Sequence, residues 1–222
     1  MCDYYFLGTS KETLMNMGLR MPYRIYHNYE VWRLLTSALL SYNLQSFAIT
    51  VIIEMIIGFM LEAAFGSFRM LLFMLITVAG ANIFASAMTY QYAVGPEAIV
   101  YGMFAGLIAM FIVYWDKLGE NTSRKICLLF IVVLLMVLSI MILQRPSKVG
   151  KAFASALFLS YPDIPACLGG CMFGLFTAFM LLPTHVKDGD DPEEKKRARC
   201  LQIIGLCMIL FLGTLFTFLF FS

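Results

Sequence analysis

Residues 92–107, YAVGPEAIVYGMFAGL, contain the start of an apolar helix that has a small residue at every fourth position. Ala98, Gly102 and Gly106 share one face, because residues four apart lie about one helical turn apart. In a membrane, a face of small residues lets the backbone of a second helix come close. Glu97 stands directly before this face. An ionisable residue at this place needs an explanation, since charged groups inside membranes are costly.

The composition of the whole chain is that of a polytopic membrane protein. Of its 222 residues, 61% are hydrophobic and 14% are charged, and the mean hydropathy is +0.82. Six stretches reach the length of about 20 mostly apolar residues that a membrane-spanning helix needs. We therefore predict an all-α polytopic membrane helical bundle, because open sheets cannot satisfy their backbone in lipid. The six predicted spans are residues 44–63, 70–92, 98–115, 126–143, 164–183 and 200–221.

A second predicted helix carries a matching face of small residues. Gly170 and Gly174 lie one turn apart in the fifth span, within the sequence ACLGGCMFG. The third and fifth spans run in the same direction, because one full hairpin separates them. Glu97 and Cys167 then fall in the first turns of these two helices, at the same face of the membrane. The sequence predicts that they share one partly buried pocket.

The pattern of charge and hydropathy divides the chain into four parts. Residues 1–43 are expected to lie in the membrane interface, because their Trp and Tyr residues are mixed with Arg as in headgroup-level segments. Residues 44–183 form the transmembrane core. Residues 184–199 form a charged linker that we expect to be solvated. Residues 200–222 form a C-terminal transmembrane helix.

The basic residues indicate an orientation. Alternating spans collect nine of them on one side, which the positive-inside rule makes cytosolic. Those of the N-terminal segment lie on the other side and reduce the difference. The one sequon, at Asn121, falls on the cytosolic side, so we expect it to carry no glycan. The cytosolic set is Arg69, Lys117, Arg124, Lys125, Lys187, Lys195, Lys196, Arg197 and Arg199, and the opposing set is Lys11, Arg20, Arg24, Arg33, Arg145, Lys148 and Lys151.

Several classes of ligand are disfavoured by the composition. A net charge of +2 without a basic, aromatic stripe argues against nucleic acid as a partner. Cys167 and Cys171 lie one turn apart, but no further Cys or His stands near them in the sequence to complete a tetrahedral metal site. We therefore expect no metal and no cofactor, and no small-molecule substrate is evident. The partners expected are the lipid bilayer and transmembrane segments of other proteins.

Several separated motifs in order resemble the rhomboid family of intramembrane serine proteases and their inactive relatives. The resemblance runs from Leu7 to Leu182 and includes EVWRLLTSALL, GFMLEAAFGSFRMLLF, VGPEAIVYGMFAGL and ACLGGCMFG. It implies a rhomboid-like bundle with a client-facing lateral opening. The family has a spanning helix before the Trp-Arg loop, and Met1 begins almost at that loop, so this first helix is either absent or encoded upstream of the given sequence. The scaffold residues that the resemblance implies are Trp32, Arg33, Glu62, Gly102, Gly106, Gly170 and Gly174.

The positions that carry the family's chemistry are altered. In the family's Gly-x-Ser-Gly motif the nucleophilic serine corresponds to Glu97, and the histidine of the dyad corresponds to Cys167. The two residues that assist the oxyanion correspond to Ser46 and Thr50. A serine hydroxyl is a poor nucleophile without an adjacent base. The resemblance therefore implies a pseudoprotease with no catalytic residues.

Three functions follow as hypotheses. The first is an inactive rhomboid-like protein that binds transmembrane segments of client proteins in trafficking, quality control or degradation. A resemblance to inactive rhomboids and to the derlin branch implies this role. We expect the protein in the endomembrane system, in the ER or Golgi. The second is an active intramembrane endopeptidase, for which a Cys167 thiolate with Glu97 as base is an unconventional version. The third is a structural membrane protein without clients.

The candidate client-binding residues are Glu97, Tyr101, Cys167 and Glu54, and each has a second interpretation. For Cys167 it is that of a small packing residue. Glu97 either accepts a polar group of a client or begins the helix as a solvated first-turn residue. Tyr101 either donates to Glu97 from one turn deeper or only packs. Glu54 is either a hydrogen-bonding handle for another helix or part of an internal hydrogen bond.

Overall fold

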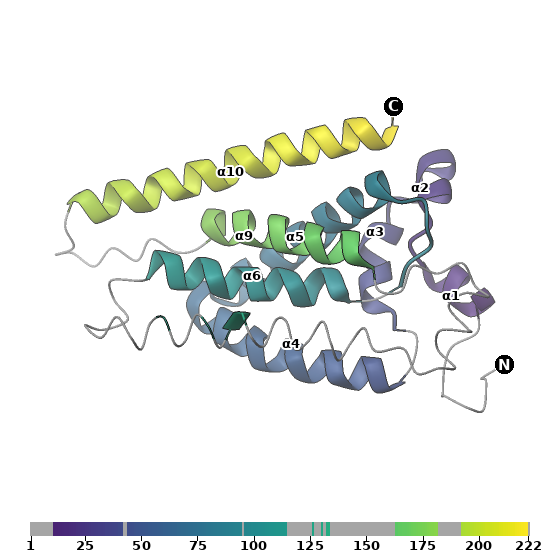
Figure 1. The fold of residues 1–222 in the computed structure, drawn as a ribbon, viewed down its shortest axis with the longest axis horizontal. Helices are drawn as coiled ribbons and strands as arrows, with labels where there is room; N and C mark the ends of the chain where they lie inside the picture. The colour runs from purple at the N-terminus through teal and green to yellow at the C-terminus, as the bar shows by residue number, and fades with distance from the viewer. Residues whose placement is uncertain are drawn as a thin grey trace.

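The computed structural model is an assembly of helices (Figure 1). It describes residues 11–41, 44–94, 96–114, 126, 130, 132–133, 163–181 and 192–221. Within these residues no β-strand is present, and two residues form one isolated bridge. The helices are α1 (Lys11–Met17), α2 (Pro22–Asn28), α3 (Arg33–Thr36), a 3-10 turn η1 (Ser37–Leu39), α4 (Leu44–Phe65), α5 (Ser67–Met88), α6 (Glu97–Val113), α9 (Ile164–Leu181) and α10 (Pro192–Phe221).

The long helices lie side by side, and the short helices gather at one end of them. Figure 1 shows α1, α2 and α3 at the end where α6 and α9 begin and where α10 finishes. Three described stretches are long and apolar enough to cross a membrane: Ser67–Met88, Ile164–Leu181 and Lys196–Phe221. The predicted all-α membrane bundle is confirmed. The count of six spans stays a prediction, since most of residues 126–143 lie outside the described residues.

Two predicted helix boundaries differ from the structure. We expected a span at 70–92, but α5 ends at Met88 and residues 92–93 are extended. The reason is that Ala93 exchanges two backbone hydrogen bonds with Arg20. We expected a charged linker at 184–199, but α10 begins at Pro192. Proline suits the first turn of a helix, and the Glu, Lys, Arg and Ala residues that follow favour helix.

A single residue connects α4 to α5. Gly66 has φ of +80°, a backbone conformation that glycine adopts without a steric penalty. Its N–H donates to the Glu62 carbonyl at 2.7 Å, and the Ser67 hydroxyl donates to the Glu62 carboxylate at 2.5 Å. Glu62 thus connects the end of α4 to the start of α5.

The helices α6 and α9 run in the same direction in direct backbone contact. A Cβ atom added to Gly170 would stand 2.5 Å from the Ala98 carbonyl oxygen. One added to Gly174 would stand 2.5 Å from the Gly102 carbonyl oxygen. Contacts that advance by four residues on both helices require parallel chains. We call this contact the glycine seam.

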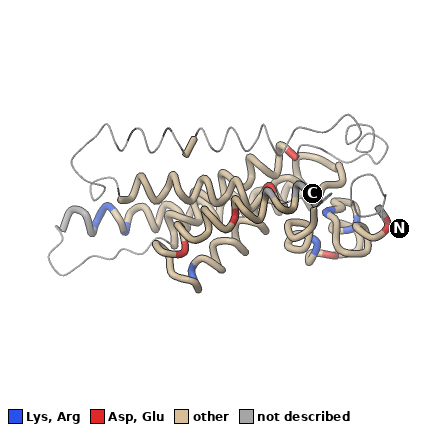
Figure 2. Tube along the Cα trace, turned by 90° about the horizontal axis from the view of Figure 1, so that it is seen from below, with Lys and Arg blue, Asp and Glu red and all other residues tan. Residues whose placement is uncertain are grey.

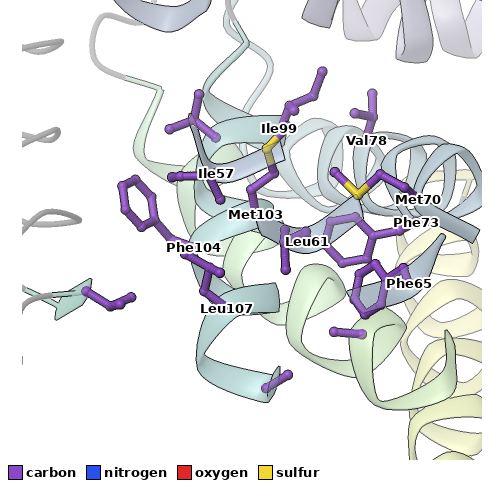
Figure 3. Packing of buried hydrophobic residues seen from close by; sticks show 14 of the residues in the cluster. Ile57, Leu61, Phe65, Met70, Phe73, Val78, Ile99, Met103, Phe104 and Leu107 are labelled. Carbon is purple, nitrogen blue, oxygen red and sulfur yellow. The ribbon is translucent and has the colours of Figure 1, made fainter. Parts of the chain in front are cut away.

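An apolar cluster beside the glycine seam joins α4, α5 and α6. Figure 3 shows Leu61 and Phe65 from α4, Phe73 from α5 and Met103 from α6 in one packed group. The rings of Phe65 and Phe73 lie 5.4 Å apart. Gly106 faces this cluster, since a Cβ atom there would meet the Phe73 ring at 3.0 Å. The buried side chains fix the positions of the long helices relative to one another.

Arg33 binds the short N-terminal helices to one another. It is 3% exposed and donates to the carbonyls of Met15 at 2.8 Å and Leu19 at 3.3 Å. It also forms an ion pair with Glu30, and this pair lowers the pKa of that carboxyl group. The adjacent Trp32 ring lies 4.7 Å below the guanidinium. The charge of Arg33 is therefore neutralised by partners within the protein.

Candidate functional site

The first residue of α6 is the centre of the candidate site. Glu97 follows Pro96 and is 6% exposed, so its carboxyl group is buried within the protein rather than solvated. The backbone N–H of Glu97 is one of the first four of the helix, which have no partner inside it. The first turn of α6 thus places the carboxyl group at the end of the helix where such N–H groups gather.

Cys167 lies in the first turn of α9, and its side chain is 8% exposed. The glycine seam brings the starts of α6 and α9 together, because contact of Ala98 with Gly170 aligns the first turns of the two helices. The turns that carry Glu97 and Cys167 therefore lie side by side, and the pocket that these residues share stays a prediction.

The other sequence-predicted residues have different surroundings. Thr50 on α4 is 2% exposed, and its hydroxyl has no hydrogen-bond partner within the described residues. The side chain of Ser46 lies outside the described residues. Tyr101 is fully buried, and its carbonyl accepts the Cys171 thiol at 3.9 Å. Glu54 is half-buried in α4, and none of the contacts described joins it to Glu97.

A buried ion pair beside Glu97 was not predicted from the sequence. The Nη1 atom of Arg20, between α1 and α2, lies 2.8 Å from the Asp163 carboxylate, and both side chains are less than 5% exposed. Asp163 directly precedes α9, and its second oxygen accepts the N–H of Ala166 at 3.4 Å. It thus caps α9 as well as pairing with Arg20. The N-terminal segment is therefore joined to the start of α9.

Asn82 on α5 extends the network around Arg20. Its side-chain oxygen Oδ1 accepts a hydrogen bond from Nη1 of Arg20 at 3.2 Å. Its side-chain nitrogen Nδ2 donates to the Leu34 backbone carbonyl at 2.6 Å. The backbone of Arg20 also pairs with Ala93 in the α5–α6 connection, at 3.1 and 3.2 Å. One buried guanidinium thus holds the N-terminal segment, α5 and α9 around the candidate site.

One edge of the Arg20 guanidinium is unused. Nη1 carries both contacts, and the atoms Nε and Nη2 are buried without an acceptor among the residues that the structure describes. Buried donors nearly always have partners, so an unused pair requires an explanation.

The described part of the chain brings no imidazole and no metal-ligand cluster to this site. The ring of His27, on α2, contacts the rings of Tyr23 at 4.3 Å and Tyr26 at 4.8 Å, and its side chain is exposed. His185, the second histidine of the sequence, lies outside the described residues. No group of three or more potential metal ligands occurs in the described regions.

The burial of two arginines bears on the predicted orientation. Arg20 and Arg33 are 1% and 3% exposed and each pairs with a carboxylate, so neither presents a free charge to lipid headgroups. Figure 2 shows basic residues at the start of α10, at the end opposite the N-terminal segment. The N-terminal segment therefore opposes the positive-inside rule less than its sequence suggests.

The network was missed because its members have no common sequence signal. Arg20 lies in a segment that resembles an interfacial helix, and Asp163 is 143 residues away from it. One available signal was Asp163 itself, since an Asp directly before an apolar helix is a preferred cap. Asn82 offered a second signal as a polar residue inside an apolar span.

Comparisons with known proteins agree with this architecture. A family model described as the Rhomboid domain matches residues 28–184. RHOMBOID-like protein 5 of Arabidopsis thaliana is 26% identical over 211 residues, which are 89% of this chain and 62% of that protein. RHOMBOID-like protein 1 of the same organism is 25% identical over 177 residues, 79% of this chain and 41% of that protein. The chain therefore spans between 41% and 62% of the length of these two relatives.

Proposed function

Because the chain belongs to the rhomboid family, we propose that it is a non-proteolytic member that binds the transmembrane segments of client proteins. The observation that carries the proposal is the pair Glu97 and Cys167. These two residues occupy the positions that the sequence resemblance assigns to the serine and histidine. They stand in the first turns of α6 and α9, which lie side by side, but they are a carboxyl and a thiol.

The chemistry of the pair supports binding rather than hydrolysis. Serine proteolysis needs a hydroxyl and a base that removes its proton. Two acidic groups in one buried pocket disfavour each other's ionisation, so a thiolate at Cys167 is a costly nucleophile beside Glu97. A buried carboxyl group remains a hydrogen-bonding group, which is valuable to a helix with polar residues in lipid.

The cellular role that we propose follows from this binding. A membrane protein that retains client helices without cutting them acts in trafficking, quality control or degradation. We place it in the ER or Golgi, with the ends of α6 and α9 that carry Glu97 and Cys167 facing away from the cytosol. Client proteins and the bilayer are its partners in this proposal.

The test is to co-express the chain with single-pass membrane proteins that are tagged at both ends. Cleavage and co-purification are scored together for the wild type, Glu97→Ala and Glu62→Ala. Glu62 is the matched control, because its carboxylate lies at the far end of α4 and bonds to Ser67. We expect intact clients to be retained by the wild type and Glu62→Ala, and at least several-fold less by Glu97→Ala.

Two results would overturn the proposal. Client fragments that disappear in Glu97→Ala would make the chain an unconventional protease. No client retention by any variant would leave a structural membrane protein. The double variant Glu97→Ser/Cys167→His restores the two residue types of the dyad, and cleavage by it alone would show that the assay detects proteolysis.

A further inference from the structure

Only one of the three nitrogen atoms of the Arg20 guanidinium has hydrogen-bond partners among the described residues, and the other two form a potential binding site. A guanidinium presents its N–H groups in a rigid planar fork, and Nε with Nη2 forms an edge that fits both oxygens of a carboxylate. In this structure Nη1 alone serves Asp163 and Asn82. The whole bidentate edge is therefore available, although it is buried.

One further carboxyl group belongs to the same end of the bundle and does not bond to this edge. Glu97 begins α6, and the contact of Ala98 with Gly170 sets the first turn of α6 beside that of α9, which is capped by Asp163, the partner of Arg20. The backbone of Arg20 also pairs with Ala93, four residues before Glu97. The other acidic groups around Glu97 are Asp163, which is already paired with Arg20, and the thiol of Cys167.

We propose that the Nε–Nη2 edge of Arg20 is a carboxylate-binding site whose ligand is the side chain of Glu97. Rotation of the Glu97 side chain onto this edge makes one guanidinium bridge the first residue of α6 and the cap of α9. Two conformations result, an open one as in the structure and a clamped one in which Arg20 holds both carboxylates. The clamp closes the space beside Cys167, whether or not a client ever binds there.

Charge supports Glu97 as the occupant. Arg20 and Asp163 together are neutral, so an added carboxylate makes the buried cluster negative and is tolerated only with strong, aligned hydrogen bonds. The unused edge of Arg20 supplies two such bonds in parallel. A Glu97 that never reaches Arg20 is instead a buried acid with little support, and replacing it with a neutral amide should then cost nothing. If Glu97 binds Arg20, Glu97→Gln should lower the stability of the protein. If it does not, the same substitution should leave the stability unchanged or raise it.

The experiment is a double-mutant cycle of Glu97→Gln and Arg20→Lys, with thermal unfolding midpoints measured on the full chain in detergent. Lysine keeps the positive charge for Asp163 but has no second edge. With Arg20 present, we expect Glu97→Gln to lower the midpoint by about 5 °C, since a hydrogen bond between charged groups is lost. In the Arg20→Lys background, Glu97→Gln should leave the midpoint unchanged or raise it. Glu62→Gln is the control and should have the same effect in both backgrounds.

A higher or unchanged midpoint for Glu97→Gln with Arg20 present would overturn the proposal, as would equal changes in the two backgrounds. If Arg20→Lys does not fold, the infrared difference spectrum between the wild type and Glu97→Gln decides. An ionised carboxylate in that spectrum supports the clamp, and a protonated carboxylic acid refutes it. Client retention plays no part in either measurement, so the clamp and the proposed function can fail separately.

Discussion

The helices α9 and α10 are both apolar enough to cross a membrane, but they differ in how much of each the protein covers. The apolar stretch of α10 has a higher mean hydropathy than that of α9. Only 17% of the stretch in α10 is buried inside the protein, compared with 44% of the stretch in α9. The more apolar helix is thus the more exposed one. In lipid, packing of small residues decides which helix is central, because apolar surface alone gives no preference for protein over lipid.

The largest expected effect is at the glycine seam. Gly174→Leu places a side chain where even a Cβ atom would stand 2.5 Å from the Gly102 carbonyl oxygen of α6. We expect a loss of more than about 4 kcal/mol, enough to remove folded protein at ordinary stabilities. The measurement is the yield of monodisperse protein after detergent extraction. Gly213→Leu on α10 is the control, because no atom lies within 4 Å of its Cβ position.

The next largest effect is expected at the start of α9, which differs from the start of α10. Asp163→Ala removes both the cap of α9 and the partner of buried Arg20, whereas Lys196, Arg197 and Arg199 near the start of α10 are exposed. Leaving a buried charge unpaired costs about 3–5 kcal/mol, so the unfolding midpoint should fall by about 10 °C. Asp163→Asn keeps the cap but not the charge, so it should recover only a small part of the lost unfolding midpoint. Equal midpoints for Asp163→Ala and the wild type would show that the ion pair contributes no stability.

A smaller effect is expected where α10 meets α9. A Cβ atom on Gly205 would stand 2.7 Å from the Phe176 carbonyl oxygen, so Gly205→Leu should push α10 away and leave the core folded. A protease site inserted within residues 182–191 tests this. After cleavage, α10 should stay bound in the wild type and in Gly213→Leu, and dissociate in Gly205→Leu. Retention of α10 in all three would mean that its contact with α9 tolerates a side chain.

The smallest effect compares two aromatic residues of α10. Phe216 is 9% exposed, and its ring lies 4.7 Å from that of Phe84 in an edge-to-face arrangement. Phe216→Leu should cost about 1 kcal/mol through loss of this ring pair, measured as a fall of the unfolding midpoint by a few degrees. Phe211→Leu should change nothing, because its ring is 60% exposed. A larger change at Phe211 would indicate that this face of α10 has a protein partner.

The contrast between the two helices also explains what the sequence could predict. The glycine seam was predictable, because Gly102, Gly170 and Gly174 are spaced by the helical repeat and because spans alternate in direction. That register also predicted that the first turns carrying Glu97 and Cys167 lie side by side, as the contact of Ala98 with Gly170 requires. The network of Arg20 was not predictable, since hydropathy assigns Arg20 to the interface and nothing local pairs it with Asp163. The early start of α10 was missed because charge suggested a solvated linker, while helix propensity prevailed.

The distance in sequence between Arg20 and Asp163 has a consequence for biosynthesis. Arg20 is made 143 residues before its partner (163 − 20). At about 5–20 residues per second, roughly 7–30 s pass between the two events on the ribosome. During that time the arginine must stay in water or headgroups, because it cannot be buried alone. The N-terminal segment can therefore take its final place only after α9 has been made, and its closure marks a late step of assembly.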